Sequence, residues 1–227
     1  MTDSAATRPR ASARARFDRV AAFKPLVFAL CLLPLAWLAW DTLHGQLGTD
    51  PVARLEHRSG DWALRFLLAT LAITPLRRLT GWAWLLRYRR MLGLFAFFHA
   101  SVHFSLYLVV DLGGFWSQVF GEIAKKPYIT VGFLAWLLML PLALTSTRAM
   151  MRRLGGHWQR LHRLVYVAGA CGALHYLWLV KSGNTIAVRE PLVYLAILVL
   201  LLALRLPGWL ARARGKRAAV PLPQAPR

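Results

Sequence analysis

The feature that most constrains this chain is a series of six apolar runs, each close to the length of a membrane-spanning helix. A helix needs about 20 apolar residues to cross the hydrocarbon core of a bilayer. The runs cover residues 25–40, 62–76, 91–110, 129–146, 161–180 and 191–206. The second and sixth span a bilayer only if their helices extend beyond these limits. The pattern predicts an all-α integral membrane protein with six transmembrane helices in one bundle.

The composition agrees with a membrane protein and argues against a nucleic-acid partner. Of 227 residues, 57% are hydrophobic, and the mean hydropathy is +0.44. The formal net charge of +20 comes from 29 lysines and arginines against 9 acids. These basic residues lie between the apolar runs and not on one polar face, so membrane topology explains them better than nucleic-acid binding. Cys31 and Cys171 lie inside apolar runs, and their spacing supports neither a disulfide nor an iron–sulfur site.

The orientation follows from where the basic residues lie. Most of them fall in four segments that alternate along the chain and so share one side of the membrane: 1–24, 77–90, 148–163 and 205–227. Most acids fall in the other connections. The positive-inside rule therefore places both termini in the cytoplasm.

The chain is expected to hold one folded domain. We expect a basic cytoplasmic tail over 1–23, a six-helix domain over 24–206, and a basic, proline-rich cytoplasmic tail over 207–227. No internal repeat is visible in the sequence. There is also no glycine-rich dinucleotide-binding fingerprint.

Four of the seven histidines lie in or at the apolar runs and are the candidate functional residues: His99, His103, His162 and His175. Ionisable side chains are costly in a membrane and usually face a partner inside the bundle. Such a histidine can hydrogen-bond a neighbouring helix, relay protons, or ligate haem iron. The remaining histidines, at 44, 57 and 157, are expected to be solvated.

Depth in the membrane separates these candidates. The third and fifth runs cross in the same direction, and His103 and His175 lie at similar distances from the outer ends marked by Asp111 and Lys181. Two imidazoles at one level on two helices suit a bis-histidine haem b site. His162 lies on the fifth run about 20 Å deeper toward the cytoplasm. It suits a second, inner haem or has another role. His99, one turn inward of His103, is an alternative ligand, a supporting residue or a plain buried histidine.

Four stretches resemble one known family. They are "HGQLGTDPVARLEHRSGDWALRFLLATLAITPLRRL" (44–79), "YRRMLGLFAFFHASVHFSLYLVVDL" (88–112), "KKPYITVGFLAWLLMLPLALTSTRAMMRRLGGHWQRLHRLVYV" (125–167) and "LHYLWLVK" (174–181). Together they resemble MsrQ, the family of haem-binding membrane subunits of protein-methionine-sulfoxide reductases, which belongs with the ferric-reductase-like transmembrane domains. A histidine at position 99 departs from the family pattern.

The resemblance implies an electron-transfer subunit of the bacterial inner membrane without a catalytic site of its own. Such a subunit takes electrons from the quinone pool or a cytoplasmic flavin donor. It passes them through haem b to a periplasmic, molybdopterin-containing methionine-sulfoxide reductase with which it forms a heterodimer, and which repairs oxidised envelope proteins. The family is also described as binding FMN. Its haem histidines fall here on His103, His162 and His175.

Two other functions remain open at this point. One is a ferric-reductase-type conduit with a different electron acceptor. The other is a small transporter or assembly factor whose histidines relay protons or bind a metal ion. The outer connection 111–128 suits either a docking surface or a plain interfacial loop. The inner arginines Arg77, Arg78, Arg89 and Arg90 could pair with haem propionates or a flavin phosphate, although most of them are expected only to set topology.

Overall fold

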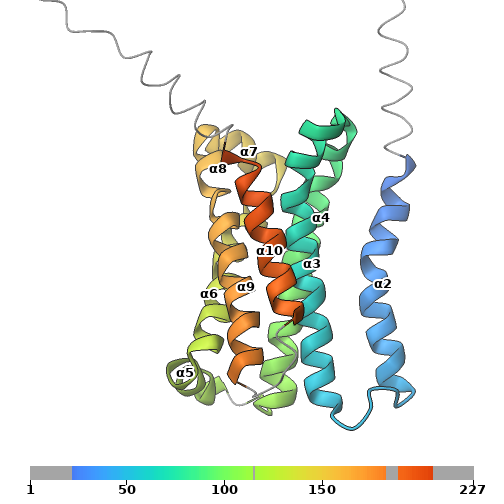
Figure 1. Ribbon diagram of the computed structural model, residues 1–227, viewed down its shortest axis with the longest axis vertical. Coiled ribbons are helices and arrows are strands. Elements are labelled where there is room, and N and C mark those ends of the chain that lie inside the picture. Colours follow the sequence, from blue (N-terminus) through green and yellow to red (C-terminus); the bar gives the residue numbers. More distant parts are fainter. Residues whose placement is uncertain (1–21, 115, 183–188, 207–227) are drawn as a thin grey trace, which may run out of the picture.

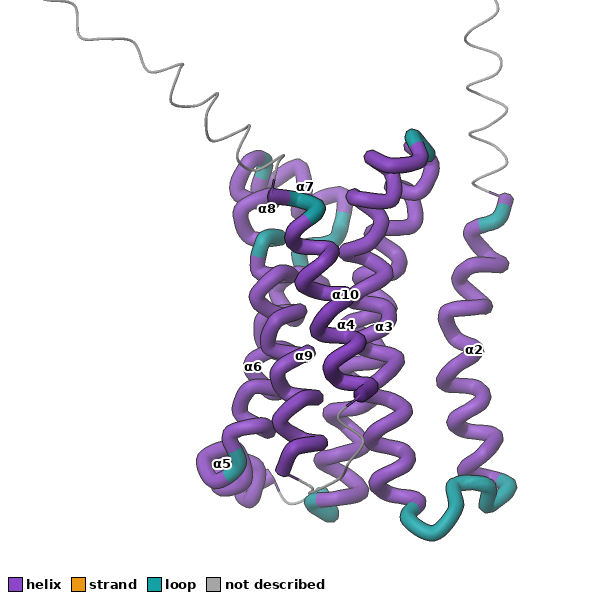
Figure 2. Tube along the Cα trace, viewed as in Figure 1, coloured by secondary structure: helices purple, strands orange, loops and turns teal. Residues whose placement is uncertain are grey.

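The described residues form a bundle of helices. A computed structural model describes residues 22–114, 116–182 and 189–206, and no strand occurs among them. The tails expected over 1–23 and 207–227 lie almost wholly outside these residues. The elements are α2 (Lys24–Leu43), α3 (Pro51–Thr80), the 3₁₀ turn η1 (Ala83–Leu85), α4 (Leu86–Leu106), the π-helical η2 (Tyr107–Asp111), α5 (Trp116–Lys125), α6 (Pro127–Leu144), α7 (Arg148–Leu154), α8 (Gly156–Leu161), α9 (Leu164–Ser182) and α10 (Arg189–Ala203) (Figures 1 and 2).

Four helical stretches are long and apolar enough to cross a membrane. They are Lys24–Leu43, Ala83–Asp111, Pro127–Leu144 and Gly156–Lys181. The second expected span lies within α3, a helix of 30 residues that also carries several charges, and the sixth lies in α10, which has 15. The all-helical membrane prediction is therefore confirmed in outline. The number of six spans stays a prediction.

Two helix pairs form the centre of the bundle. α3 packs along α4 and α6 packs along α9 more extensively than any other pairs. α10 lies against α9 and α3, whereas α2 stands at the side and touches α3 and α4 (Figure 1). Phe66, Phe95, Met139 and Ala168 from all four central helices share one buried cluster.

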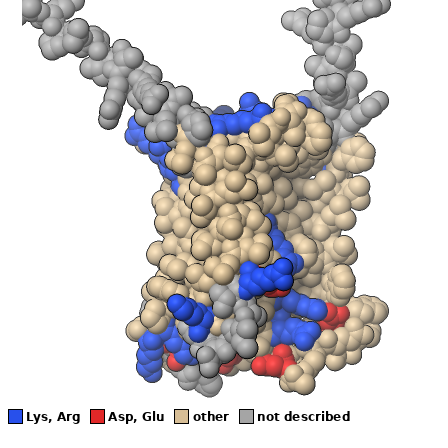
Figure 3. Space-filling view, in the orientation of Figure 1, with Lys and Arg blue, Asp and Glu red and all other residues tan. Residues whose placement is uncertain are grey.

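The two ends of the bundle differ. α7 and α8 lie at one end, here called the inner end, and α5 lies at the opposite, outer end (Figure 1). α2 starts and α10 finishes at the inner end. Figure 3 shows basic residues along the inner rim and again toward the outer end, while the acidic residues visible on this face lie only toward the outer end. The orientation of the two ends in the membrane stays a prediction.

α3 extends beyond its apolar run and is capped at both ends. Asp50 accepts a hydrogen bond from the Ala53 amide at 3.0 Å, with Pro51 in the first turn. Gly81 closes the other end with φ +73°, a left-handed conformation that suits glycine. The extension carries Glu56, Ser59 and Gly60 alongside the outer half of α4.

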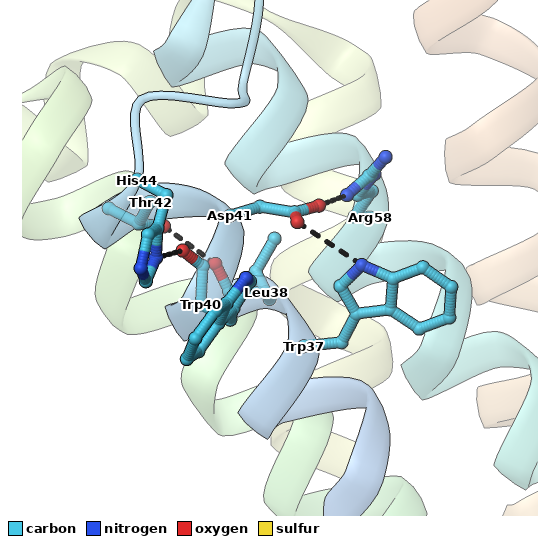
Figure 4. A network of polar contacts seen from close by, with 7 residues as sticks. All are labelled: Trp37, Leu38, Trp40, Asp41, Thr42, His44 and Arg58. Carbon is cyan, nitrogen blue, oxygen red and sulfur yellow. Dashed lines mark hydrogen bonds and ion pairs between the residues drawn. The ribbon is translucent and has the colours of Figure 1, made fainter.

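Two polar contacts attach α2 to the bundle. Near the outer end, the Asp41 carboxylate is buried, pairs with Arg58 of α3 and accepts a hydrogen bond from Trp37 Nε1 at 3.1 Å (Figure 4). Deeper in the bundle, His99 Nε2 of α4 donates to the Cys31 carbonyl at 3.1 Å. Because a polar group left unpaired in lipid is costly, these contacts fix how α2 is placed against the bundle.

One predicted helix is interrupted. The sequence places His162 on a helix over 161–180, but α8 ends at Leu161, His162 follows it as the cap, and α9 begins at Leu164. The His162 amide and its ring Nδ1 both donate to the Trp158 carbonyl, and the Arg163 amide bonds Arg160 in a tighter 3₁₀ turn. A second difference concerns the connection expected over 111–128, which contains the amphipathic helix α5.

Candidate functional site

A cavity opens between the two central helix pairs, toward the outer end. Its volume is about 340 Å³, within the range of roughly 300–1,000 Å³ that is usual for small-molecule and cofactor sites. Residues with little or no side chain line it from all four helices: Ala53, Gly60, Ala63, Ala100, Gly132, Ala135, Ala168 and Gly172. The space exists because these positions project no bulk between the helices.

His103 of α4 and His175 of α9 face one another in this cavity. Their ring centres are 6.2 Å apart and the ring planes meet at 67°. Both side chains line the cavity and are only partly accessible. The expectation that these two histidines lie at one depth is confirmed.

Each imidazole is held by a backbone carbonyl of the paired helix. His103 Nδ1 donates to the Glu56 carbonyl of α3 at 3.0 Å, and His175 Nδ1 donates to the Tyr128 carbonyl of α6 at 2.7 Å. The Ser59 hydroxyl also lies 3.2 Å from His103 Nδ1 and donates to the Glu56 carbonyl at 3.0 Å. A proton on Nδ1 leaves Nε2 with a free electron pair, which is the form of histidine that binds metals.

A glycine one helical turn after each carbonyl makes these contacts possible. A Cβ at Gly132 would lie 2.6 Å from His175 Nδ1, and a Cβ at Gly60 would lie 3.2 Å from His103 Cε1. Glycine inside a helix costs about 1 kcal/mol relative to alanine. Here it allows the imidazole to reach the helix backbone.

The two halves of the site repeat one arrangement. Each carbonyl lies 47 residues before the histidine it anchors. In both halves the glycine is on the first helix of a pair and the histidine is on the second. No repeat is visible in the sequence, because only the carbonyl, the glycine and the histidine recur, and any residue can supply a carbonyl.

His162 lies elsewhere. It caps α8 at the inner end and is not among the cavity residues. Its ring stacks on Trp158 with centres 3.8 Å apart, its Nδ1 donates to the Trp158 carbonyl at 3.0 Å, and its buried Nε2 makes no hydrogen bond of standard geometry. The structure therefore brings two of the three predicted site histidines together and leaves the third apart.

His99 is a buried histidine with a packing role. Its side chain is 2% exposed, it stacks on Phe66 with ring centres 4.9 Å apart, and it bonds the Cys31 carbonyl. It shares a helix with His103 but does not line the cavity. His57 is exposed, as expected of a solvated residue, but it is on α3 and not in a loop, and it lines the outer part of the cavity.

Sequence comparisons place the chain in a family. The profile described as "Ferric reductase like transmembrane component" matches residues 59–173. The protein-methionine-sulfoxide reductase heme-binding subunit MsrQ of Xanthomonas euvesicatoria is 55% identical over 215 residues, which cover 92% of this chain and 97% of that protein. The subunit of the same name from Herminiimonas arsenicoxydans is 48% identical over 198 residues, 87% of this chain and 89% of that protein. No solved structure matches the chain.

The chain belongs to the MsrQ family.

The ferric-reductase-like profile covers the cavity incompletely at one end. The profile region begins at Ser59, includes His103 and His162, and ends two residues before His175. The matches to the two MsrQ proteins extend well past this limit, since they cover most of this chain and most of each relative. Membership in the MsrQ family therefore rests on the match over most of the chain, whereas the profile alone does not reach both facing histidines.

Several residues that contact the two histidines or line the cavity were not predicted from the sequence. Gly60 and Gly132 are helical glycines, whose cost could have prompted the question of what approaches them. Tyr128 acts through its carbonyl and Ser59 through a hydroxyl, and neither type stands out in a helical run. The polar groups at the outer end of the cavity were also missed; they are Glu56, His57, Asp61, Tyr107, Asp111, Lys126 and Tyr176.

The Glu56 carboxyl lies outside the apolar run of α3 and in unfavourable surroundings. Burial, together with repulsion from Asp111 and Asp50, raises its pKa to about 7, and its Oε1 has no hydrogen-bond partner. Between the unfolded value of about 4.3 and the folded value, the folded protein binds more protons at Glu56. The contribution of Glu56 to stability therefore falls as the pH rises through this window, and the cost of its charge is complete above it.

We expect Glu56→Gln to raise the melting temperature in detergent at about pH 8 and to change it little at about pH 5, because glutamine removes a charge that forms only at the higher pH. Glu122→Gln is the control of opposite sign. A hydrogen bond from Lys126 lowers the pKa of Glu122, so its loss lowers the melting temperature at pH 8. An equal effect of Glu56→Gln at both pH values would contradict the assignment.

Proposed function

We propose that this chain is the haem b-binding electron-transfer subunit of a methionine-sulfoxide reductase system in the bacterial inner membrane. The observation that carries the proposal is the pair of imidazoles, His103 and His175, facing each other across a cavity between the central helices. The heme-binding subunits to which the chain is similar give the class of cofactor.

The residues present fit a haem. Two imidazoles on opposite sides of one metal ion, with bonds of about 2 Å each, have ring centres about 6 Å apart. The observed separation is 6.2 Å, and both rings have Nδ1 occupied and Nε2 left for a metal. Among the described residues, no three or more His, Cys, Asp or Glu side chains gather to hold a bare metal ion. Two imidazoles would be enough to hold a haem, since its macrocycle supplies the other ligands.

The protein's own contribution is to hold and orient. Bound haem would supply a one-electron iron couple. The Glu56 and Tyr128 carbonyls keep each ring in one tautomer and orientation, and a hydrogen bond at Nδ1 raises the basicity of the ligating nitrogen. The apolar lining keeps water away from the two rings, and the small residues leave room for a flat cofactor.

In this proposal α3 and α10 join the four candidate spans, which makes six membrane crossings. α3 packs along α4 and α10 packs along α9, with their axes roughly aligned to those of the long apolar helices (Figure 1). This alignment supports α3 and α10 crossing the membrane as well. With six spans, the basic inner end lies in the cytoplasm together with both termini. The cavity then lies in the outer half of the membrane, on the side of a periplasmic acceptor.

The electron path runs from inside to outside in this proposal. Electrons enter from the quinone pool or a cytoplasmic flavin donor, and they leave to a periplasmic, molybdopterin-containing methionine-sulfoxide reductase that pairs with this chain. FMN is proposed from the family resemblance, and the arginines of the inner end suit its phosphate. His162 stays a proposed cofactor contact at the inner end, separate from the His103–His175 pair.

Replacing either facing histidine tests the site directly. We expect His103→Ala and His175→Ala each to remove most haem from the purified protein, because each variant lacks one of the two imidazoles that would hold the iron. His99→Ala is the matched control on the same helix and keeps its haem. The pyridine haemochrome assay gives haem per polypeptide. One haem in the wild type, retained in His162→Ala, is expected, and full haem retention in His103→Ala or His175→Ala would refute the site.

The glycine beside His175 gives a subtler test. We expect Gly132→Ala to displace the imidazole from the Tyr128 carbonyl, because the added Cβ would lie 2.6 Å from Nδ1. The low-temperature electron paramagnetic resonance signal of the oxidised haem should shift, and the haem content should fall. Gly121→Ala on α5 is the control, since nothing lies within 4 Å of its added Cβ. Identical spectra for the two variants would contradict the role given to Gly132.

The acceptor is tested by reconstitution. We expect the reduced protein to be reoxidised by a periplasmic methionine-sulfoxide reductase only when methionine sulfoxide is present, as followed by the Soret band. Omitting the enzyme, or replacing the sulfoxide by methionine, should leave the haem reduced. Reoxidation that does not depend on methionine sulfoxide would point to a different acceptor, and a colourless protein from haem-replete cells would refute the haem proposal itself.

A further inference from the structure

The cavity is strongly asymmetric in polarity. Its inner part is lined by apolar and small residues, among them Leu64, Leu67, Met139 and Ala168. Apart from the two facing histidines and Trp136, which donates its Nε1 to Ser101, the polar lining residues lie at the outer end. They come from the start of α3, the end of α4 with η2, the start of α6 and the end of α9.

This asymmetry bears on how an acidic ligand would lie in the cavity. A carboxylate buried without a hydrogen-bonding or charged partner is strongly unfavourable. The inner part of the cavity offers it no donor. A flat cofactor that carries two carboxylates on one edge can satisfy them only when that edge points to the outer end.

We propose that the haem carboxylates point outward and are held by the Tyr107 hydroxyl and the Lys126 ammonium group. This inference rests on the proposed haem between His103 and His175. Tyr107 ends the run of α4 on which His103 lies, and Lys126 caps the start of α6 one residue before Pro127. The two donors therefore belong to the same two helices as His103 and the Tyr128 carbonyl.

Both groups are poised to donate. The Tyr107 hydroxyl is buried and has no hydrogen-bond partner, and it lies within reach of the charges of both Glu122 and Lys126. Lys126 pairs with Glu122 at 2.6 Å, yet its side chain is 45% exposed and lines the cavity. Glu56 and Asp111 at the same end oppose a further anion, so a carboxylate there needs nearby donors such as these two. Tyr176, by contrast, already donates to Glu190 at 3.1 Å.

The inner arginines do not compete for this role. Arg77, Arg78, Arg89 and Arg90 are absent from the cavity lining, so the expectation that they could pair with haem propionates is not supported by their position. Arg205 is buried at the inner end, but its guanidinium group bonds Tyr166 and the Leu71 carbonyl. An apolar wall separates these cations from the histidine pair.

The test compares purified haem-loaded variants. We expect Tyr107→Phe and Lys126→Met each to shift the propionate-bending band in the resonance Raman spectrum and to speed haem loss to apomyoglobin about tenfold, the effect of losing one charge-assisted hydrogen bond. Lys125→Met is the matched control, since Lys125 is the neighbouring lysine and does not line the cavity. Arg89→Met probes the inner alternative. Neither of these two should change the band or the rate.

A second measurement changes the cofactor and compares its effect in the wild type and in the two outer variants. Wild-type protein from haem-deficient membranes is loaded with haem or with haem dimethyl ester, whose carboxylates are blocked. We expect the ester to leave the wild type about a hundredfold faster than haem does, because both charge-assisted bonds are lost. The Tyr107→Phe and Lys126→Met variants should discriminate less between the two. A shifted band or faster loss in Arg89→Met, or wild-type behaviour of both outer variants, would overturn the inference while leaving the haem site intact. A colourless wild type would overturn the proposed function and this inference together.

Discussion

The hydrogen bond from a ring nitrogen to a helix carbonyl is the contact on which the site depends. His103 and His175 each donate Nδ1 to a carbonyl of the helix beside them. The bond requires close packing of two helices, and that packing requires a glycine where the ring lies against the backbone. It also fixes the tautomer, because the nitrogen that donates must carry the proton. Ring position, helix spacing and metal-binding capacity therefore follow from one contact, made once in each helix pair.

The two pairs give the bundle an approximate internal symmetry. α3 with α4 and α6 with α9 each contribute one anchored imidazole, and the cavity lies between the pairs. Neither pair alone encloses the space. The surrounding helices support this arrangement: α2 is attached by the Asp41–Arg58 ion pair and the His99–Cys31 contact, and α10 covers α9 and α3. Buried polar contacts are suited to this task in lipid, where apolar burial does not favour one helix partner over another.

Some of the site was predictable and some was not. His103 and His175 were identified because helical rise converts distance along the sequence into depth, and both runs cross in the same direction. The same reasoning placed His162 correctly at the inner end but wrongly on a continuous helix, since a 3₁₀ turn stabilised by the Trp158 carbonyl interrupts the chain there. His99 and His103 lie one helical turn apart, so depth alone could not decide which of them faces His175. The difference is that His99 is turned toward α2 and His103 toward the cavity.

The sequence by itself determined that the chain is a helical membrane bundle, because bilayer thickness and unsatisfied backbone groups leave apolar runs of this length no other regular structure. The charge pattern predicted its direction, and family membership follows from identity over most of the chain. Only the tertiary structure decided which helices pair, which carbonyl each histidine meets and where the cavity is polar. The two histidine–carbonyl contacts each join residues that are 47 positions apart in the sequence. Helix packing sets such contacts, and it depends on the shapes of all four central helices at once.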